Sequence, residues 1–228
     1  LYFEDYVLAI QYFNQVITAK PYLADPYYFR AMAKFMLDDF KGAEEDASEC
    51  LVRNPYYTAA YQLRGAARQN QEKYDQAATD YQRSLEFFPE DRITLVNMGI
   101  VNVELEQYDV AAKFFEILLR RFPDYTPGYL TRSQMYLEMK DTTSALADID
   151  KAIEIDPYTS QSFASRGVLY LQQKEYNKAL ADLDEAIRLD PYFEGNYINR
   201  GLVKYHLNDL RGAMADYDRV IETDENNL

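Results

Sequence analysis

The sequence contains few of the residues that usually carry chemistry. It has 228 residues but only one Cys, one His and no Trp. The single cysteine, Cys50, excludes a disulfide framework, and a packed, unreactive thiol is the simplest interpretation of it. A nucleophilic site would have to be built around His206, and the acidic runs lack the spacing of a calcium loop. No zinc spacing or glycine-rich phosphate loop occurs either. We therefore expect no catalysis, no cofactor and no metal ion.

Positive charge and long apolar runs are also scarce. The chain has 24 Lys and Arg residues against 38 Asp and Glu, a net charge of -14. This balance argues against nucleic acid as a partner, because phosphate binding needs clustered basic residues. No apolar run approaches the roughly 18 residues that cross a bilayer, so we expect no membrane insertion by this segment. The expected partner is a protein or peptide with some apolar or positive surface.

Glycine and proline are few, at eight each, but their positions are regular. Prolines and alanines both recur every 34 residues along the chain. The prolines are Pro21, Pro55, Pro89, Pro123, Pro157 and Pro191, and the alanines are Ala9, Ala43, Ala77, Ala111, Ala145, Ala179 and Ala213. No insertion or deletion interrupts the register, which indicates an array of one repeated structural unit.

Within each unit the apolar spacing is helical. In residues 58–91, Tyr61 and Gly65 mark one helix, while Ala77 and Tyr81 mark a second with the spacing of a helix face. A polar link separates the two, and a proline closes each unit because it cannot sit in a helix interior. Small residues fall where the two helices must approach closely. No segment alternates like a strand, so the predicted fold class is all-α, built from antiparallel helix hairpins.

This pattern resembles the tetratricopeptide repeat (TPR) family. One copy reads Tyr61, Gly65, Ala77, Tyr81, Ser84 and Pro89, and another reads Phe163, Gly167, Ala179, Leu183, Ala186 and Pro191. The resemblance covers essentially the whole chain and implies an α-α superhelix, a solenoid of stacked hairpins. It implies a half repeat with only the second helix at residues 1–23, and six repeats at 24–57, 58–91, 92–125, 126–159, 160–193 and 194–228. We expect the array to be part of a longer protein, because residues 223–228 end it without the usual polar capping helix.

One position in each repeat is charged in five copies and apolar in the remaining copy. The residue before the small position is Arg30, Arg64, Met98, Arg132, Arg166 or Arg200, and sixteen residues later stands Asp46, Asp80, Phe114, Asp148, Asp182 or Asp216. The copy that loses Arg also loses Asp. We interpret this as an ion pair between the two helices of a repeat, because breaking one buried partner costs about 3–5 kcal/mol whereas replacing both can be neutral. Pairing between adjacent repeats fits less well, because it would leave Asp80 opposite Met98.

The resemblance also implies that the first helices of the repeats line a concave binding face. The candidate groove residues are Val96, Ile100, Val103, Glu104, Leu130, Gln134, Leu137, Glu138, Val168 and Leu171. In the outer repeats the corresponding positions are Tyr28, Met32, Phe35 and Met36, and Ile198, Leu202, Tyr205 and His206. None of these is Lys or Arg, so the clamp that other TPR modules use for acidic C-terminal tails is missing. A peptide with apolar side chains and a basic residue would suit this face. The alternative is that Val96, Ile100 and Val103 only pack between neighbouring repeats.

Four tyrosines directly follow the repeat prolines, and they are Tyr22, Tyr56, Tyr158 and Tyr192. We expect them to pack at the repeat junctions rather than to form a platform for carbohydrate.

The sequence thus predicts a non-enzymatic scaffold that binds a peptide or protein segment in its groove. The alternative is a docking or regulatory module of a larger enzyme or sensor whose catalytic part lies outside this chain. Residues 1–6 and 199–201 resemble multi-repeat TPR proteins of Gram-negative bacteria, some of which are exported. This resemblance favours a periplasmic location slightly over a cytoplasmic one. The uncapped ends also suggest end-to-end self-contacts.

Overall fold

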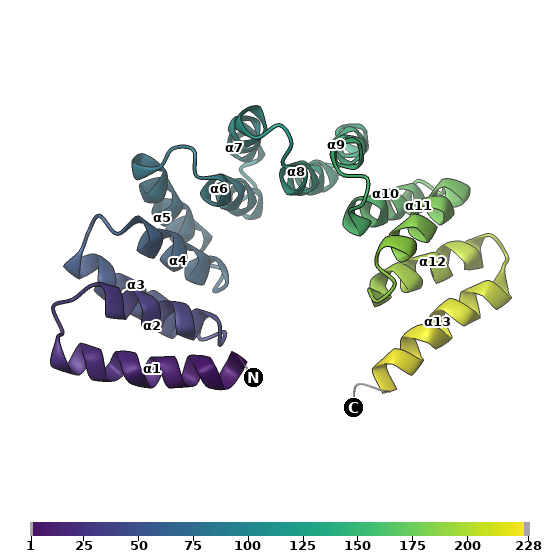
Figure 1. The fold of residues 1–228 in the computed structure, drawn as a ribbon. Helices are drawn as coiled ribbons and strands as arrows, with labels where there is room; N and C mark the ends of the chain where they lie inside the picture. The colour runs from purple at the N-terminus through teal and green to yellow at the C-terminus, as the bar shows by residue number, and fades with distance from the viewer. Residues whose placement is uncertain (1, 226–228) are drawn as a thin grey trace. The chain divides into compact units, whose positions relative to one another are not determined.

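The computed structural model describes residues 2–225, with side chains for residues 5–222. These residues form thirteen α-helices joined by short connections, with no strand among them (Figure 1). The helices fall into two compact units, Leu1–Pro123 and Asp124–Leu228. The predicted all-α fold class is confirmed. The expectations for residue 1 and residues 226–228 lie outside the described part of the chain.

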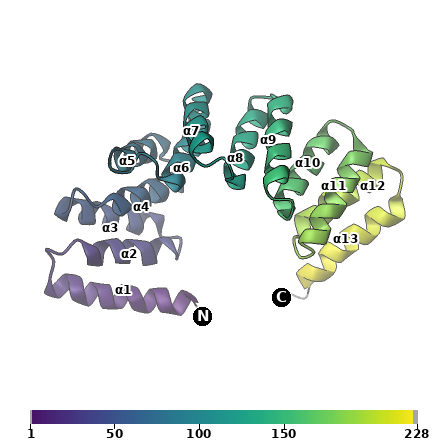
Figure 2. The same ribbon diagram turned by 45° about the horizontal axis from the view of Figure 1, so that its top comes forward.

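Consecutive helices pack against each other as hairpins within each unit (Figures 1 and 2). The first unit contains α1 (Tyr2–Ala19), α2 (Asp25–Phe35), α3 (Phe40–Arg53), α4 (Thr58–Gln69), α5 (Tyr74–Phe87), α6 (Arg92–Glu104) and α7 (Tyr108–Arg121). The second contains α8 (Thr126–Glu138), α9 (Thr142–Ile155), α10 (Ser160–Gln172), α11 (Tyr176–Leu189), α12 (Glu194–His206) and α13 (Leu210–Glu225). We name the even-numbered helices the first helices of their repeats and the odd-numbered ones the second helices.

Two or three residues after its last residue, each first helix is followed by a residue with left-handed backbone. These residues are Asp38, Glu72, Glu106, Lys140, Lys174 and Asn208, with φ between 57° and 63°. The next residue closes the corner, as when the Asp141 N–H donates to the Tyr136 carbonyl at 2.8 Å. This bond, five residues back, is the one that defines a Schellman motif. The corner looked weak in the sequence because none of these residues is glycine.

A proline follows the end of each of the second helices α1, α3, α5, α7, α9 and α11. The residue before it is extended, with φ -137° and ψ 92° at Asn54, because proline disfavours helical backbone in its predecessor. The Asn54 side chain then accepts the Tyr56 N–H at 3.1 Å. Asp156 and Asp190 make the same bond in the second unit.

The tyrosines after the prolines are exposed, which corrects the expectation that they pack at the junctions. Tyr22, Tyr56, Tyr158 and Tyr192 are 70%, 75%, 78% and 87% exposed. The junction is filled instead by the leading aromatic of the next helix. Tyr61, for example, donates its hydroxyl to the Pro55 carbonyl at 3.1 Å, and Tyr197 does the same to Pro191.

The two helices of a repeat meet at a small residue that faces a large one. A Cβ atom added at Gly99 would lie 2.4 Å from the Phe115 ring, and one at Gly65 would lie 2.7 Å from Tyr81. Both distances are shorter than packed atoms allow, so only glycine fits opposite these rings. Where the small position is Ala31, the residue sixteen later is the small Ala47. The helix spacing in each repeat is therefore set by a matched pair of residues.

Candidate functional site

The structure brings together the two members of each proposed ion pair. The guanidinium of Arg132 donates from Nε and Nη2 to the two carboxylate oxygens of Asp148, at 2.7 and 2.6 Å. The same two-bond geometry occurs in every copy that carries the pair, and the pairs are Arg30–Asp46, Arg64–Asp80, Arg132–Asp148, Arg166–Asp182 and Arg200–Asp216. All five aspartates are at most 6% exposed. The hydrogen bonds to Asp148 raise the pKa of Arg132, so this pair stays charged.

Four of these arginines donate a third hydrogen bond to a side chain of the preceding repeat. The sequence did not predict these bonds between repeats. Arg166 Nη1 donates to Asp150 at 2.7 Å, and Arg200 Nη1 donates to Asp184 at 2.7 Å. In the first unit the acceptors are Asn14 for Arg30 and Ser48 for Arg64. All of these acceptors lie sixteen residues before their arginine, on the preceding second helix. Because their residue type varies, no repeated letter in the sequence marks them.

The copy with Met98 has a cavity at this place. Met98 is 5% exposed, and it lines a cavity of about 540 Å³ together with Tyr61, Arg64, Ala78, Thr79, Asp80, Gln82, Arg83 and Glu86. Gln82 is the residue sixteen before Met98, which corresponds to the acceptors of the other copies. In the third repeat, Met98 and Phe114 replace the arginine and the aspartate. This replacement removes the ion pair within the repeat and also the hydrogen bond from arginine to the preceding repeat.

The remaining basic residues of the first helices also point toward carboxylates of second helices. Lys34 pairs with Asp46, and Lys204 with Asp216, both at 2.8 Å. Arg68 pairs with Asp80 at 2.8 Å and with Glu44 at 2.9 Å. Arg92, at the start of α6, lies over the Phe122 ring, with 5.8 Å from its guanidinium carbon to the ring centroid.

Glu44 joins three helices of the first unit. Its carboxylate accepts hydrogen bonds from Arg68 and Gln71 at the end of α4 and from Lys73 at the start of α5. Burial alone would raise the pKa of Glu44. The hydrogen bonds from Lys73, Arg68 and Gln71 outweigh this effect and lower the pKa to about 2.

The candidate groove residues of the first unit are less open than expected. Val103 is only 8% exposed, which corrects its assignment to an open face. Val96 and Ile100 are half-buried, and Glu104 is exposed. The more open apolar side chains on the same face belong to α2. They are Met32, at 40% exposed, and Met36, at 56%.

In the second unit the candidate residues divide into packed and open ones. Leu130 and Leu137 pack against the core cluster of Ala145, Ile149 and Leu169, and Leu171 packs against the cluster that contains Val203. Val168 is half-buried, whereas Gln134 and Glu138 are exposed. The most open apolar stripe lies on α12, where Ile198, Leu202 and Tyr205 are 48%, 40% and 58% exposed.

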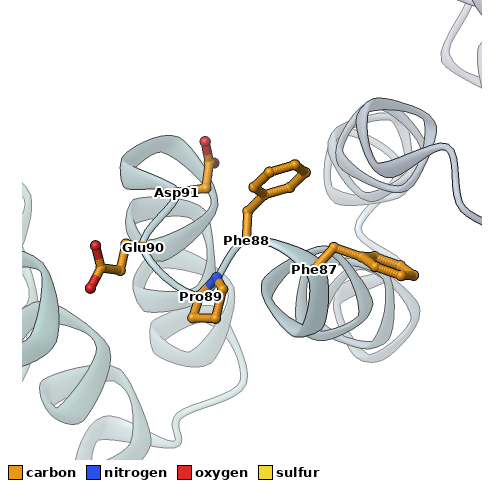
Figure 3. Close-up of a pocket in the computed structure, with 5 residues that line it drawn as sticks. All are labelled: Phe87, Phe88, Pro89, Glu90 and Asp91. Carbon is orange, nitrogen blue, oxygen red and sulfur yellow. The ribbon is translucent and has the colours of Figure 1, made fainter.

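A second cavity of about 540 Å³ lies at the loop between α5 and α6, lined by Phe87, Phe88, Pro89, Glu90 and Asp91 (Figure 3). The Phe88 ring and the Asp91 carboxylate project to the same side of the loop, while Phe87 points away from them (Figure 3). Phe88 is 59% exposed. It occupies the position of Asn54 and Asp156, whose side chains accept a backbone N–H in the loops of other repeats. Asp91 accepts hydrogen bonds from Thr94 and Gln62, so it is part of the helix start.

The single cysteine and the single histidine, which are the side chains considered for a nucleophilic site, lie in different helices. Cys50 is 0% exposed, and burial raises the pKa of its thiol to about 11. The exposed His206 ring stacks on Tyr176, with 4.8 Å between centroids. Within residues 5–222, no group of three or more His, Cys, Asp and Glu side chains is placed to hold a metal ion. No described helix is both long and apolar enough to cross a membrane.

Comparison with solved structures finds the same fold in several proteins. A TPR protein from Parabacteroides merdae superposes with a TM-score of 0.70 at 19% identity, over 87% of this chain and 79% of that one. Pseudomonas aeruginosa pilF superposes with a TM-score of 0.71 at 14% identity, over 88% and 91% of the two chains. YrrB, a TPR protein with an unusual peptide-binding site, gives a TM-score of 0.58 at 22% identity, over 81% and 95%. A search of curated proteins finds no match.

Family models of the tetratricopeptide repeat match residues 63–126, 126–159, 160–193 and 195–227. The matched segments follow one another along most of the chain. The fold of this family supports a protein–protein interaction scaffold, and the chain belongs to the tetratricopeptide repeat family.

Proposed function

We propose that the chain binds a protein or peptide segment on its first helices, and that the preferred segment is apolar with at least one basic residue. One observation carries this proposal. The basic side chains within α2, α4, α8, α10 and α12 are engaged by carboxylates of second helices. The acids Glu104 and Glu138 stay exposed on the first helices. The charge that a ligand meets there is therefore negative.

Exposed apolar side chains supply the rest of the surface, and each unit has its own set. The first unit offers Met32 and Met36, and methionine side chains adapt readily to differently shaped ligands. The second unit offers Ile198, Leu202 and Tyr205 on one face of α12. Spacings of four and three residues place them in a row, as required to hold an extended or helical segment.

The overall charge favours the same ligand. A net charge of -14 attracts basic segments and repels acidic ones at long range. Binding of acidic C-terminal tails is disfavoured for this reason, and because the first helices present no unpaired lysine or arginine in α2, α4, α8, α10 and α12. The peptide-binding site named for YrrB shows that a similar fold can hold a peptide.

The test is a selection from a library of random peptides displayed on phage, with the chain as bait. We expect enrichment of peptides that combine Leu, Ile, Phe or Met with Arg or Lys. The variants Met36→Glu in the first unit and Leu202→Glu in the second should each reduce binding of a group of selected peptides. Both side chains are at least 40% exposed, so neither change should disturb folding. Val52→Glu is the matched control, because Val52 is 75% exposed on the second helix α3.

Reversing the charge of an exposed acidic residue on a first helix tests whether the ligand needs a basic residue. Glu138→Lys should shift the selected peptides of the second unit away from Arg and Lys. Enrichment of acidic peptides by the unmodified chain would contradict the proposal, as would binding that Val52→Glu removes but Met36→Glu and Leu202→Glu leave intact.

A further inference from the structure

One place in the first unit lacks the guanidinium group that the equivalent place holds in other repeats. Arg30, Arg64, Arg166 and Arg200 each reach from a first helix to the second helix of the preceding repeat. In the third repeat Met98 takes the position of the arginine, and its side chain has no N–H to donate. A cavity of about 540 Å³ lies there, lined by residues of α4, α5 and α6.

The cavity is large enough for a side chain and can be reached from solvent. Its volume of about 540 Å³ is many times the roughly 30 Å³ that one water molecule occupies in the liquid. Thr79, Gln82, Arg83 and Glu86 line it and are exposed, so a group from another molecule can enter beside them. All four lie on the second helix α5. The cavity therefore opens between residues of a second helix, apart from the exposed side chains of the first helices.

The wall of the cavity offers two hydrogen-bond acceptors. Gln82 stands sixteen residues before Met98. In other repeats the residues at this position accept a bond from arginine, and they are Asn14, Ser48, Asp150 and Asp184. Glu86 accepts a hydrogen bond from Arg83 with Oε2, which leaves Oε1 for a second cation. The side chains of Tyr61, Ala78 and Met98 supply apolar surface for an aliphatic stem.

Two arginines also line the cavity, and both are paired within the chain. Arg64 donates to the two carboxylate oxygens of Asp80 at 3.0 and 2.7 Å. Arg83 pairs with Glu86, and both of these side chains are about half exposed, at 47% and 48%. The positive charge of the wall is therefore balanced by carboxylates.

The sixth repeat shows that a guanidinium group fits beside such a pair. Arg200 donates to Asp184 on α11 at 2.7 Å. Two residues before Asp184 on the same helix, Asp182 binds both donors of Arg166. The guanidinium of Arg200 thus lies next to an arginine pair equivalent to that of Arg64 with Asp80.

We propose that the cavity beside Met98 binds an arginine side chain of a partner protein. The guanidinium takes the place of the missing arginine and donates to Gln82 and Glu86, while its stem packs against Met98. Arginine suits the cavity better than lysine because its planar group directs several donors to different acceptors. The net charge of -14 attracts such a basic segment. The site does not use the first-helix surface of the proposed function, so either proposal can fail without the other.

The probe is a five-residue peptide with one central arginine between serine and glycine residues, acetylated and amidated at its ends. Three comparison peptides carry citrulline, lysine or norleucine in place of the arginine. Binding to the full chain is followed by NMR, through the backbone amide signals of residues 78–86. We expect saturable shifts with the arginine peptide. The citrulline peptide should bind at least about tenfold more weakly, because it has the same shape without the charge.

Two variants of the chain locate the binding site. Met98→Arg combined with Phe114→Asp restores the pair that five other repeats contain, so the variant should fold and its own guanidinium should fill the cavity and abolish binding. Glu86→Gln should weaken binding about threefold, and folding is expected because Glu86 is exposed. The matched control is Glu154→Gln at the equivalent position of α9, where Glu154 pairs with Lys151. This control should leave binding unchanged.

Four results would overturn the proposal. The first is that the arginine peptide causes no shifts in residues 78–86. The second is that the citrulline, lysine or norleucine peptide binds as tightly as the arginine peptide. The third is that binding persists in the folded variant with Met98→Arg and Phe114→Asp. The fourth is that Glu86→Gln and Glu154→Gln have equal effects, which tests the site independently of the double variant.

Discussion

At the scale of single residues, one arginine side chain holds three helices together. Arg166 binds Asp182 on the second helix of its own repeat and Asp150 on the second helix of the preceding one. A guanidinium group suits this task because its five N–H donors form a rigid planar fork. Two donors face one carboxylate and a third remains for another acceptor. The same side chain therefore sets both the hairpin and the contact with its neighbour.

The first prediction concerns the exchange of this pair for an apolar one. Arg132→Met alone should lower the free energy of unfolding by about 3 kcal/mol, because it leaves the Asp148 carboxylate buried without its partner. Adding Asp148→Phe should recover most of this loss, since Met98 and Phe114 show that the backbone accepts the apolar pair. Urea unfolding followed by circular dichroism measures both values.

Arg188→Met is the control for this prediction. Arg188 pairs with Glu185 on an exposed helix surface, so its loss should cost less than about 1 kcal/mol. If the double variant is as unstable as Arg132→Met alone, the apolar exchange in the third repeat needs another explanation.

The second prediction concerns a buried hydroxyl. Ser84 Oγ is buried without a hydrogen-bond partner among the described residues, and the equivalent residues Ala152 and Ala186 are also buried. Ser84→Ala should raise the free energy of unfolding by about 1 kcal/mol, because it removes an unsatisfied polar group. Ser48→Ala should instead lower it by about 1 kcal/mol, because Ser48 accepts a bond from Arg64 and donates one to the backbone carbonyl of Glu44. Equal effects of the two changes in urea unfolding would rule out this account.

At the scale of elements, the corners of the hairpins contain strain that glycine would relieve. Lys140 has φ 61°, a conformation that costs a residue with a side chain about 1 kcal/mol or more. Lys140→Gly should therefore raise the free energy of unfolding by about 0.5–1 kcal/mol, after the greater freedom of glycine in the unfolded chain is subtracted. Thermal unfolding measures the change.

The matched control is Lys113→Gly, in the exposed interior of α7. This change should destabilise the chain by about 1 kcal/mol, because glycine is a poor helix former. Destabilisation by both changes would show that the corner at Lys140 is not strained.

The contacts between α3, α4 and α5 should depend on pH through Glu44. Its pKa is about 2 in the folded chain and about 4.3 in an unfolded one. Because the folded pKa is lower, the stabilisation is complete above the unfolded value and is lost as the pH falls through the folded value. The difference in melting temperature between the unmodified chain and Glu44→Gln should therefore shrink from pH 5 to pH 2. A difference that stays constant over this range would mean that the Glu44 carboxylate is not responsible.

At the scale of the whole molecule, the fold could be predicted because the sequence repeats itself. The positions of Pro55, Ala77 and Gly65 each recur at the same spacing, so every repeat supports the interpretation of the others. The partnership of Arg132 with Asp148 was visible for a related reason. One copy, with Met98 and Phe114, changes both members together, and this change reveals the contact.

Features that depend on the surface of each helix could not be predicted in the same way. Val103 has the same apolar character whether it lines a groove or is buried, and here it is buried. Tyr56 and Tyr61 are the same residue type, yet the Tyr56 side chain is 75% exposed whereas the Tyr61 hydroxyl donates to the Pro55 carbonyl at the junction. The left-handed backbone of Lys140 could not be predicted, because an exposed lysine is compatible with a helix as well as with a turn.

The functional account also belongs to this scale, because it rests on how charge is distributed between the two kinds of helix. Carboxylates of second helices engage the basic residues of α2, α4, α8, α10 and α12. The exposed first-helix residues on which the proposal rests, Met36, Leu202, Glu104 and Glu138, are apolar or acidic. A ligand with apolar and basic residues is the chemical complement of this surface.

Photo-crosslinking of a selected peptide tests this central claim most directly. A photoreactive amino acid is placed at Met36 or Leu202 on first helices, and at Val52 or Ile117 on second helices, all of them exposed. The account predicts that the peptide crosslinks to the chain from Met36 or Leu202 and not from Val52 or Ile117. Crosslinks from Val52 or Ile117, with none from the first helices, would contradict it.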